Sequence, residues 1–170
     1  MAQRLAALLT VVLLAGCHSA AARSGGSAGS EQQIRALLDR WQSAFERRDV
    51  AGVMSVYLPD KSLTIYDVPP PLVLHGSDAL RRDYAGYFAR FDGPLHSELR
   101  DLHIVAGPTS GFAYYLQGIE GRLKDGTKIR RWIRVTQGYR LVEGRWLVVH
   151  DHVSVPIDPK THMGKFDLTP

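Results

Sequence analysis

Three ionisable side chains lie next to one another near the C-terminus, where His150, Asp151 and His152 interrupt the apolar stretch GRWLVVHDHVSVPID. The valines are typical of a β-strand, and successive side chains of a strand point to opposite faces. Alternation therefore predicts that both histidines share a face with Trp146 and Val148, with Asp151 on the other face. Two imidazoles on one face are suited to proton transfer or to metal binding.

Two further polar residues are predicted near the histidines. Arg134 lies in the preceding strand, where antiparallel pairing would bring it beside His150 and His152. Asp67 lies at a two-residue spacing from apolar positions of an earlier strand, which predicts that its side chain points toward the core. A carboxyl group directed inward needs a partner or a function.

The functional interpretation is an apolar pocket in which a carboxylate removes a proton next to a carbonyl group of a small ligand. Asp67 would be the base because an apolar environment raises the pKa of a carboxyl group. His152 would be the second catalytic residue, and a His or Arg would stabilise the developing oxyanion without any cofactor. The predicted substrate-binding residues are Tyr57, Tyr66, Phe88, Arg134 and His150.

Two other interpretations of the same residues remain open. Arg134 could form a buried ion pair with Asp67 or Asp151, and the histidines could donate to backbone carbonyl groups. His150, His152 and Asp67 could also provide three metal ligands. The remaining histidines show no motif spacing, and we therefore predict no metal site.

The N-terminus has the pattern of a secretory signal over residues 1–16, with Arg4 followed by an apolar run. Leu14-Ala15-Gly16-Cys17 resembles the lipobox of bacterial lipoproteins, which implies cleavage before Cys17 and lipidation of that residue. Residues 17–30 are rich in Gly and Ser and are predicted to form a flexible tether. We therefore expect a protein of the bacterial cell envelope, lipid-anchored to a membrane and facing the periplasm or the exterior.

Composition and charge indicate one globular domain. The chain has 170 residues, 45% of them hydrophobic, and a formal net charge of +4. Its basic residues are scattered rather than gathered into one tract, so we do not expect nucleic-acid binding. The Gly-x-Ser-x-Gly spacing occurs only inside the Gly- and Ser-rich run, at residues 25–29, and the sequence has no glycine-rich phosphate loop and no cysteine nucleophile.

Helical patterns come first in the chain and strand patterns follow. A helix is expected over residues 31–48, a short one after an Asp49 cap, and a third from Ser77. A strand over 62–68 and an extended segment at 72–76 separate the second helix from the third. Four long strands then form a predicted antiparallel meander over residues 96–106, 112–123, 127–142 and 145–155. This order predicts an α+β fold.

The element order and three phrases resemble the SnoaL-like branch of the nuclear transport factor 2-like superfamily, which includes ketosteroid isomerases and polyketide cyclases. The phrases are LLDRWQSAFERRDVAGVMSVY, YDVPPPLVLHGSDALRRDYAGYF and DGTKIRRWIRVTQGYRLVEGRWLVVHDHVSVP. The resemblance covers residues 31–158 and leaves 159–170 as a tail. It implies a cone-shaped, curved, mixed or antiparallel sheet wrapped around three N-terminal helices, with an apolar pocket and often a homodimer.

Three functions are compatible with this resemblance, because one fold hosts several. The first is a membrane-tethered domain that binds a small apolar or carbonyl-bearing ligand. The second is a cofactor-independent isomerase or cyclase with an Asp base, although the Tyr and protonated-Asp pair of ketosteroid isomerase has no convincing match here. The third is a homodimeric assembly module.

Overall fold

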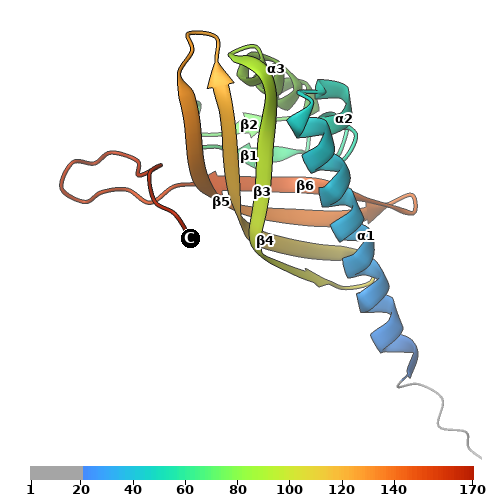
Figure 1. The fold of residues 1–170 in the computed structure, drawn as a ribbon. Helices are drawn as coiled ribbons and strands as arrows, with labels where there is room; N and C mark the ends of the chain where they lie inside the picture. The colour runs from blue at the N-terminus through green and yellow to red at the C-terminus, as the bar shows by residue number, and fades with distance from the viewer. Residues whose placement is uncertain (1–20) are drawn as a thin grey trace, which may run out of the picture.

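The computed structural model describes residues 21–170, with side chains from residue 27 onward. A long N-terminal helix crosses a strongly curved sheet, and two shorter helices lie near one end of it (Figure 1). The predicted α+β architecture is confirmed. The signal segment and Cys17 lie outside the described residues, and no helix among the residues described is long and apolar enough to cross a membrane.

The helices are α1 (Ala21–Glu46), α2 (Val50–Met54) and α3 (Ser77–Phe88). Asp49 caps α2 as predicted, because its carboxylate accepts a hydrogen bond of 2.9 Å from the Gly52 N–H. Helix α1 begins ten residues before the predicted start at residue 31, so Ser30 lies inside it. Extending an existing helix costs much less than nucleating one, which explains how the Gly- and Ser-containing segment joins it.

One sheet has the strand order β2-β1-β6-β5-β4-β3. Strand β1 pairs with β6 in parallel, and every other pair is antiparallel. Asp125-Gly126 and Glu143-Gly144 form the turns of the last two hairpins, and both glycines have positive φ as these tight turns require. The strands are β1 (Thr64–Tyr66), β2 (Leu74–His75), β3 (Phe91–Ala106), β4 (Ser110–Leu123), β5 (Lys128–Val142) and β6 (Arg145–Ser154).

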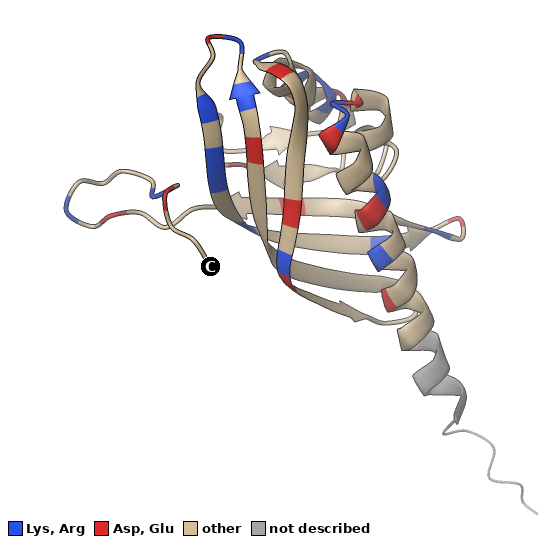
Figure 2. Cartoon of the chain, viewed as in Figure 1, with Lys and Arg blue, Asp and Glu red and all other residues tan. Residues whose placement is uncertain are grey.

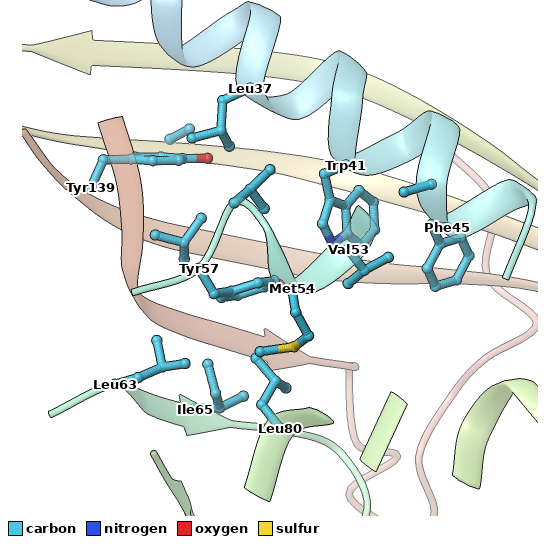
Figure 3. Close-up of a cluster of buried hydrophobic side chains, with 14 of the residues drawn as sticks. Leu37, Trp41, Phe45, Val53, Met54, Tyr57, Leu63, Ile65, Leu80 and Tyr139 are labelled. Carbon is cyan, nitrogen blue, oxygen red and sulfur yellow. The ribbon is translucent and has the colours of Figure 1, made fainter. Parts of the chain in front are cut away.

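The core lies between the concave face of the sheet and the helices. Helix α1 contributes an apolar stripe at helical spacing, and its main sheet contact is β3. Figure 3 shows Leu37, Trp41 and Phe45 from this stripe directed toward Val53 and Met54 of α2. Because the helices cover only part of the concave face, the rest of it can line a cavity.

A β-bulge in β6 decides which polar residues face the core. Tyr139 of β5 pairs with Val148, whereas the next residue back, Gly138, pairs with His150, so Val149 is an extra residue. Such an insertion reverses the alternation of side chains beyond it. Asp151 consequently joins the buried face, at 5% exposure, and the prediction that His150 and His152 occupy that face is wrong.

The surface charges are mixed in sign. Figure 2 shows acidic and basic residues interspersed along α1 and at the strand ends, with no continuous basic tract in this view. The four ion pairs of the described residues are partly exposed, including Glu120 with Arg130 at 2.9 Å.

Candidate functional site

A cavity of about 620 Å³ lies between the concave face of the sheet and helices α1 and α3. Strands β4, β5 and β6 provide one wall, and the segment after β1 and the C-terminal segment complete it. Its apolar part includes Phe45, Leu80, Ile119, Ile133, Val135 and Val153. The cavity lies within the size range of small-molecule sites in proteins.

Asp151 is the central polar residue of the buried part of the cavity. Its Oδ2 atom accepts hydrogen bonds from Tyr57 Oη at 2.9 Å and from Gln137 Nε2 at 3.0 Å. Burial raises the pKa of Asp151 to about 7, and the two hydrogen bonds oppose that rise. Near neutral pH this carboxyl group can therefore either accept or donate a proton.

Two tyrosines extend the hydrogen-bond network around Asp151. Tyr139 donates to Gln137 Oε1 at 2.5 Å, which leaves the amide of Gln137 directed at the carboxylate. The hydroxyl groups of Tyr57 and Tyr84 lie 3.1 Å apart. Antiparallel pairing of β5 with β6 places Gln137 opposite Asp151, so the register of the sheet assembles this group.

Three buried polar atoms of the described residues lack a hydrogen-bond partner: Asp151 Oδ1, Tyr115 Oη and Trp41 Nε1. All three residues line the cavity. Buried polar atoms are nearly always paired, because an unpaired one costs about 1–3 kcal/mol. Their concentration around one cavity gives it a set of polar groups that can bind a ligand.

The more exposed end of the cavity carries charged residues. Asp67 and Asp83 line it, and burial raises the pKa of both carboxyl groups. Arginines also line it, from α3, from the residue before β3 and from β5: Arg82, Arg90 and Arg131. Phe166 of the C-terminal segment lies against Arg131, with the guanidinium carbon 5.1 Å from the ring centre.

Four predicted site residues lie on the opposite, convex face of the sheet. His150 Nδ1 is 2.9 Å from the Thr64 carbonyl oxygen, and Tyr66 packs edge-on against His150 and His152. Arg134 is exposed, and the described residues give it no ion pair with Asp67 or Asp151. The bulge at Val149 explains the position of the histidines, and Tyr66, at 44% exposure, does not line the cavity.

The other predicted residues lie closer to the cavity. Asp67 lines it directly. Tyr57 lies behind it and holds Asp151 rather than contacting the open space. Phe88 is a core residue, packed edge-on against Phe45 with ring centres 5.4 Å apart, and does not line the cavity.

Sequence reasoning missed Asp151 as a cavity residue although it lay in the stretch under scrutiny. Strict alternation assigned Asp151 to the wrong face, and Gly138, which pairs with His150, was a local signal of irregular strand geometry. Gln137 and Tyr115 carried no distinctive motif. Within residues 21–170 no cluster of three or more metal-ligating side chains occurs.

The comparisons with known proteins agree with this architecture of a curved sheet enclosing a pocket. The model of the SnoaL-like domain family matches residues 34–158. An NTF2-like protein of unknown function from Pseudomonas putida KT2440 is 31% identical, with 86% of this chain and 100% of that chain covered and a TM-score of 0.77. The chain therefore belongs to the SnoaL-like domain family.

More distant structures share the fold alone. A candidate dehydratase of the NTF2-like family from Streptomyces avermitilis is 17% identical, with 77% of this chain and 99% of that chain covered and a TM-score of 0.67. A ketosteroid isomerase-like protein from Erwinia carotovora atroseptica SCRI1043 is 18% identical, with 74% and 95% covered and a TM-score of 0.63. The search of curated proteins found no match.

Proposed function

We propose that this domain binds a small, largely apolar organic molecule that carries a carbonyl or hydroxyl group. The observation that carries the proposal is the set of three unpartnered polar atoms on cavity residues, Asp151 Oδ1, Tyr115 Oη and Trp41 Nε1. The hydroxyl of Tyr115 donates to a carbonyl oxygen, and the indole N–H of Trp41, which also acts on the nearby Tyr84 hydroxyl, is a second donor. The Asp151 oxygen accepts from a hydroxyl group or, when protonated, donates.

Native mass spectrometry of the purified protein tests ligand binding directly, because a retained molecule can be released by denaturation and identified. The neutral fluorophore N-phenyl-1-naphthylamine gives a second measurement, since its emission rises in apolar sites. Ile133→Trp should fill the cavity and raise the Kd of the fluorophore at least about tenfold. Thr136→Trp, which changes an exposed position of the same strand, is the matched control. Equal binding to both variants, or no binding to the wild type, overturns the proposal.

A second candidate function is proton transfer on a carbonyl ligand, and the pKa of about 7 at Asp151 favours it. A carboxylate poised near neutral pH removes a proton next to a carbonyl more effectively than an ordinary aspartate does. Asp67, whose pKa burial also raises, is the alternative base.

Exchange of carbon-bound hydrogen for deuterium tests this second function. A panel of cyclic ketones is incubated with the protein in D₂O and followed by NMR. Accelerated exchange that disappears in Asp151→Asn, with fluorophore binding retained, assigns the base to Asp151. Disappearance in Asp67→Asn instead assigns it to Asp67. If the protein binds ketones but accelerates the exchange of none of them, the enzymatic function is excluded and the binding function remains.

We also propose that the domain is held at a membrane of the bacterial cell envelope through lipid on Cys17. The support is the lipobox-like sequence around that residue. Metabolic labelling with an alkyne analogue of palmitate should mark the wild type and not Cys17→Ser. Labelling of both, or of neither, counts against the anchor.

Homodimer formation is proposed from the convex face of the sheet. Aromatic side chains are half exposed there, including Phe112 at 45% and Tyr114 at 46%, and His103 stacks on Tyr114 with ring centres 4.9 Å apart. Exposed apolar patches of this kind mark interaction sites. Sedimentation at micromolar concentration should show a dimer that Tyr114→Glu dissociates, and a monomeric wild type overturns the proposal.

A further inference from the structure

Arg131 is an arginine on the concave face of the sheet that has no anionic partner. It lies on β5 opposite Ile119 of β4 and lines the cavity with it. None of the ion pairs or side-chain hydrogen bonds of residues 27–170 involves its guanidinium group. A partly buried cation without a counterion is unfavourable. The guanidinium group of Arg131 therefore favours the binding of an anion that the described chain does not provide.

The contact with Phe166 leaves the hydrogen-bonding edge of Arg131 available. The guanidinium carbon lies 5.1 Å from the centre of the Phe166 ring, in the range of a cation–π contact. Such a contact uses the flat face of the group, whereas its N–H donors lie in the plane and match the two oxygens of a carboxylate. Phe166 therefore orients the Arg131 side chain and leaves its N–H groups free to donate hydrogen bonds.

A second cation and a hydroxyl group lie close to Arg131. Arg90 and Tyr87 line the same end of the cavity. Burial raises the pKa of Tyr87 to about 12, Arg131 and Arg90 act against that rise, and Asp67 adds to it, which places both positive charges and one carboxyl group near the Tyr87 hydroxyl. Arg90 likewise forms no ion pair within residues 27–170, and its charge also acts on the Asp125 carboxyl group, whose pKa it helps to lower. The two guanidinium groups and the Tyr87 hydroxyl together provide hydrogen-bond donors and positive charge suited to binding an anion.

Within residues 27–170 no ion pair joins Arg131 to either of the two carboxyl groups at this end of the cavity. Asp67 follows β1 and Asp83 belongs to α3, so they come from other walls of the cavity than β5. Burial raises the pKa of both, and the charge of Asp83 adds to the rise at Asp67, so these carboxyl groups lie close to each other. Asp67 also already accepts a hydrogen bond from the Val68 N–H at 2.7 Å.

We propose that Arg131, together with Arg90 and the Tyr87 hydroxyl, binds an anionic group of the ligand, which is therefore an amphiphilic organic acid. This inference rests on the proposed binding function and adds the substrate class. The apolar body of the acid lies along Ile133 and Val135. Its far end reaches the unpartnered polar atoms near Asp151.

The strand geometry limits the length of such a ligand. Arg131, Ile133, Val135 and Gln137 follow one another on the concave face of β5, and Gln137 pairs with Asp151. Six residues of extended strand span about 20 Å. An acid longer than this cannot have its charged group at Arg131 and its other end at Asp151 without folding.

Two fluorophores that differ by one anionic group test the proposal on the full-length protein. They are 1-anilinonaphthalene-8-sulfonate and the uncharged N-phenyl-1-naphthylamine. We expect Arg131→Gln to weaken binding of the sulfonate about tenfold and to change binding of the neutral compound less than twofold. Arg131→Lys, which keeps the charge, should lose less affinity. Arg134→Gln, on the opposite face of the same strand, is the matched control and should change neither.

The possible results distinguish failure of the anion site at Arg131 from failure of ligand binding in the cavity. Binding of the neutral fluorophore that Ile133→Trp abolishes, combined with sulfonate binding that Arg131→Gln leaves unchanged, retains the pocket and overturns the anion site. An equal loss for both fluorophores in Arg131→Gln overturns it as well, because the arginine then only shapes the cavity. If neither fluorophore binds to the wild type, both proposals are overturned. Circular dichroism confirms that each variant is folded.

Discussion

Gln137 and Asp151 lie opposite each other on β5 and β6, and the Gln137 amide donates a hydrogen bond of 3.0 Å to Asp151 Oδ2. Tyr57 donates to the same oxygen at 2.9 Å. The other carboxylate oxygen, Oδ1, is buried and unpartnered. One oxygen of the carboxyl group is thus held by two side chains, and the other has no side-chain partner among the described residues.

Asp151→Asn should make the protein more stable at pH 7.5 than the wild type and remove part of the pH dependence of its stability. The folded pKa of about 7 exceeds the unfolded value of about 3.9, so the folded state binds more protons between these values. The free energy of unfolding of the wild type therefore falls as pH rises from 4 to 7, by up to about 1.4 kcal/mol per unit.

Urea unfolding of both proteins from pH 4.5 to 7.5 measures this effect. Asp67 and Asp83, whose pKa values burial also raises, contribute a slope of the same sign in both proteins. The difference between wild type and variant therefore measures the titration of Asp151 together with its electrostatic coupling to Asp67. A difference that does not change with pH would show that the carboxyl group titrates normally in the folded protein.

Tyr57→Phe should cost more stability at pH 8 than at pH 5. The hydroxyl donates to Asp151, and a hydrogen bond to a charged acceptor is worth about 1.5–3 kcal/mol, compared with about 1 kcal/mol for a neutral one. Losing this donor also raises the pKa of Asp151 further. Tyr139→Phe is the matched control, because its hydroxyl donates to the neutral amide oxygen of Gln137 and its loss should cost the same at both pH values.

Alanine substitution of the two histidines should leave the cavity intact. His150 and His152 lie on the convex face with Tyr66, so neither change should alter the Kd of N-phenyl-1-naphthylamine more than about twofold. His150→Ala should lower the free energy of unfolding by about 1 kcal/mol because it loses the contact with the Thr64 carbonyl. Strongly weakened fluorophore binding in either folded variant would contradict the placement of these residues.

The sequence predicted those helices and strands whose side-chain spacing is regular, and it failed where a strand contains an irregularity. Apolar spacing predicted the helices, and Asp125-Gly126 and Glu143-Gly144 predicted two hairpins because these pairs favour positive φ. The resemblance predicted the family and the pocket-bearing sheet. The two histidines and Asp151 were assigned to the wrong faces of β6, because one extra residue at Val149 reverses the alternation and strand pairing is not visible in a single sequence.

The charged end of the cavity was missed for another reason. Arg131 belongs to the arginine pair 130–131, and only the register of β5 against β4 shows that Arg131 points inward while Arg130 pairs with Glu120 on the outer face. Phe166 lies in the segment predicted to be a tail. Its place against the cavity depends on contacts distant in sequence, which local patterns do not encode.

Phe166→Ala should weaken ligand binding and leave the fold intact. The ring lines the cavity and covers the guanidinium face of Arg131, so its removal takes away apolar contact area and frees the arginine. Loss of about 1 kcal/mol of apolar contact corresponds to about a fivefold rise in the Kd of N-phenyl-1-naphthylamine. Leu168→Ala, at a position 48% exposed and outside the cavity, is the control. Fluorescence titration of both variants decides whether the C-terminal segment belongs to the binding site, because equal affinities would show that residues 159–170 contribute nothing to it.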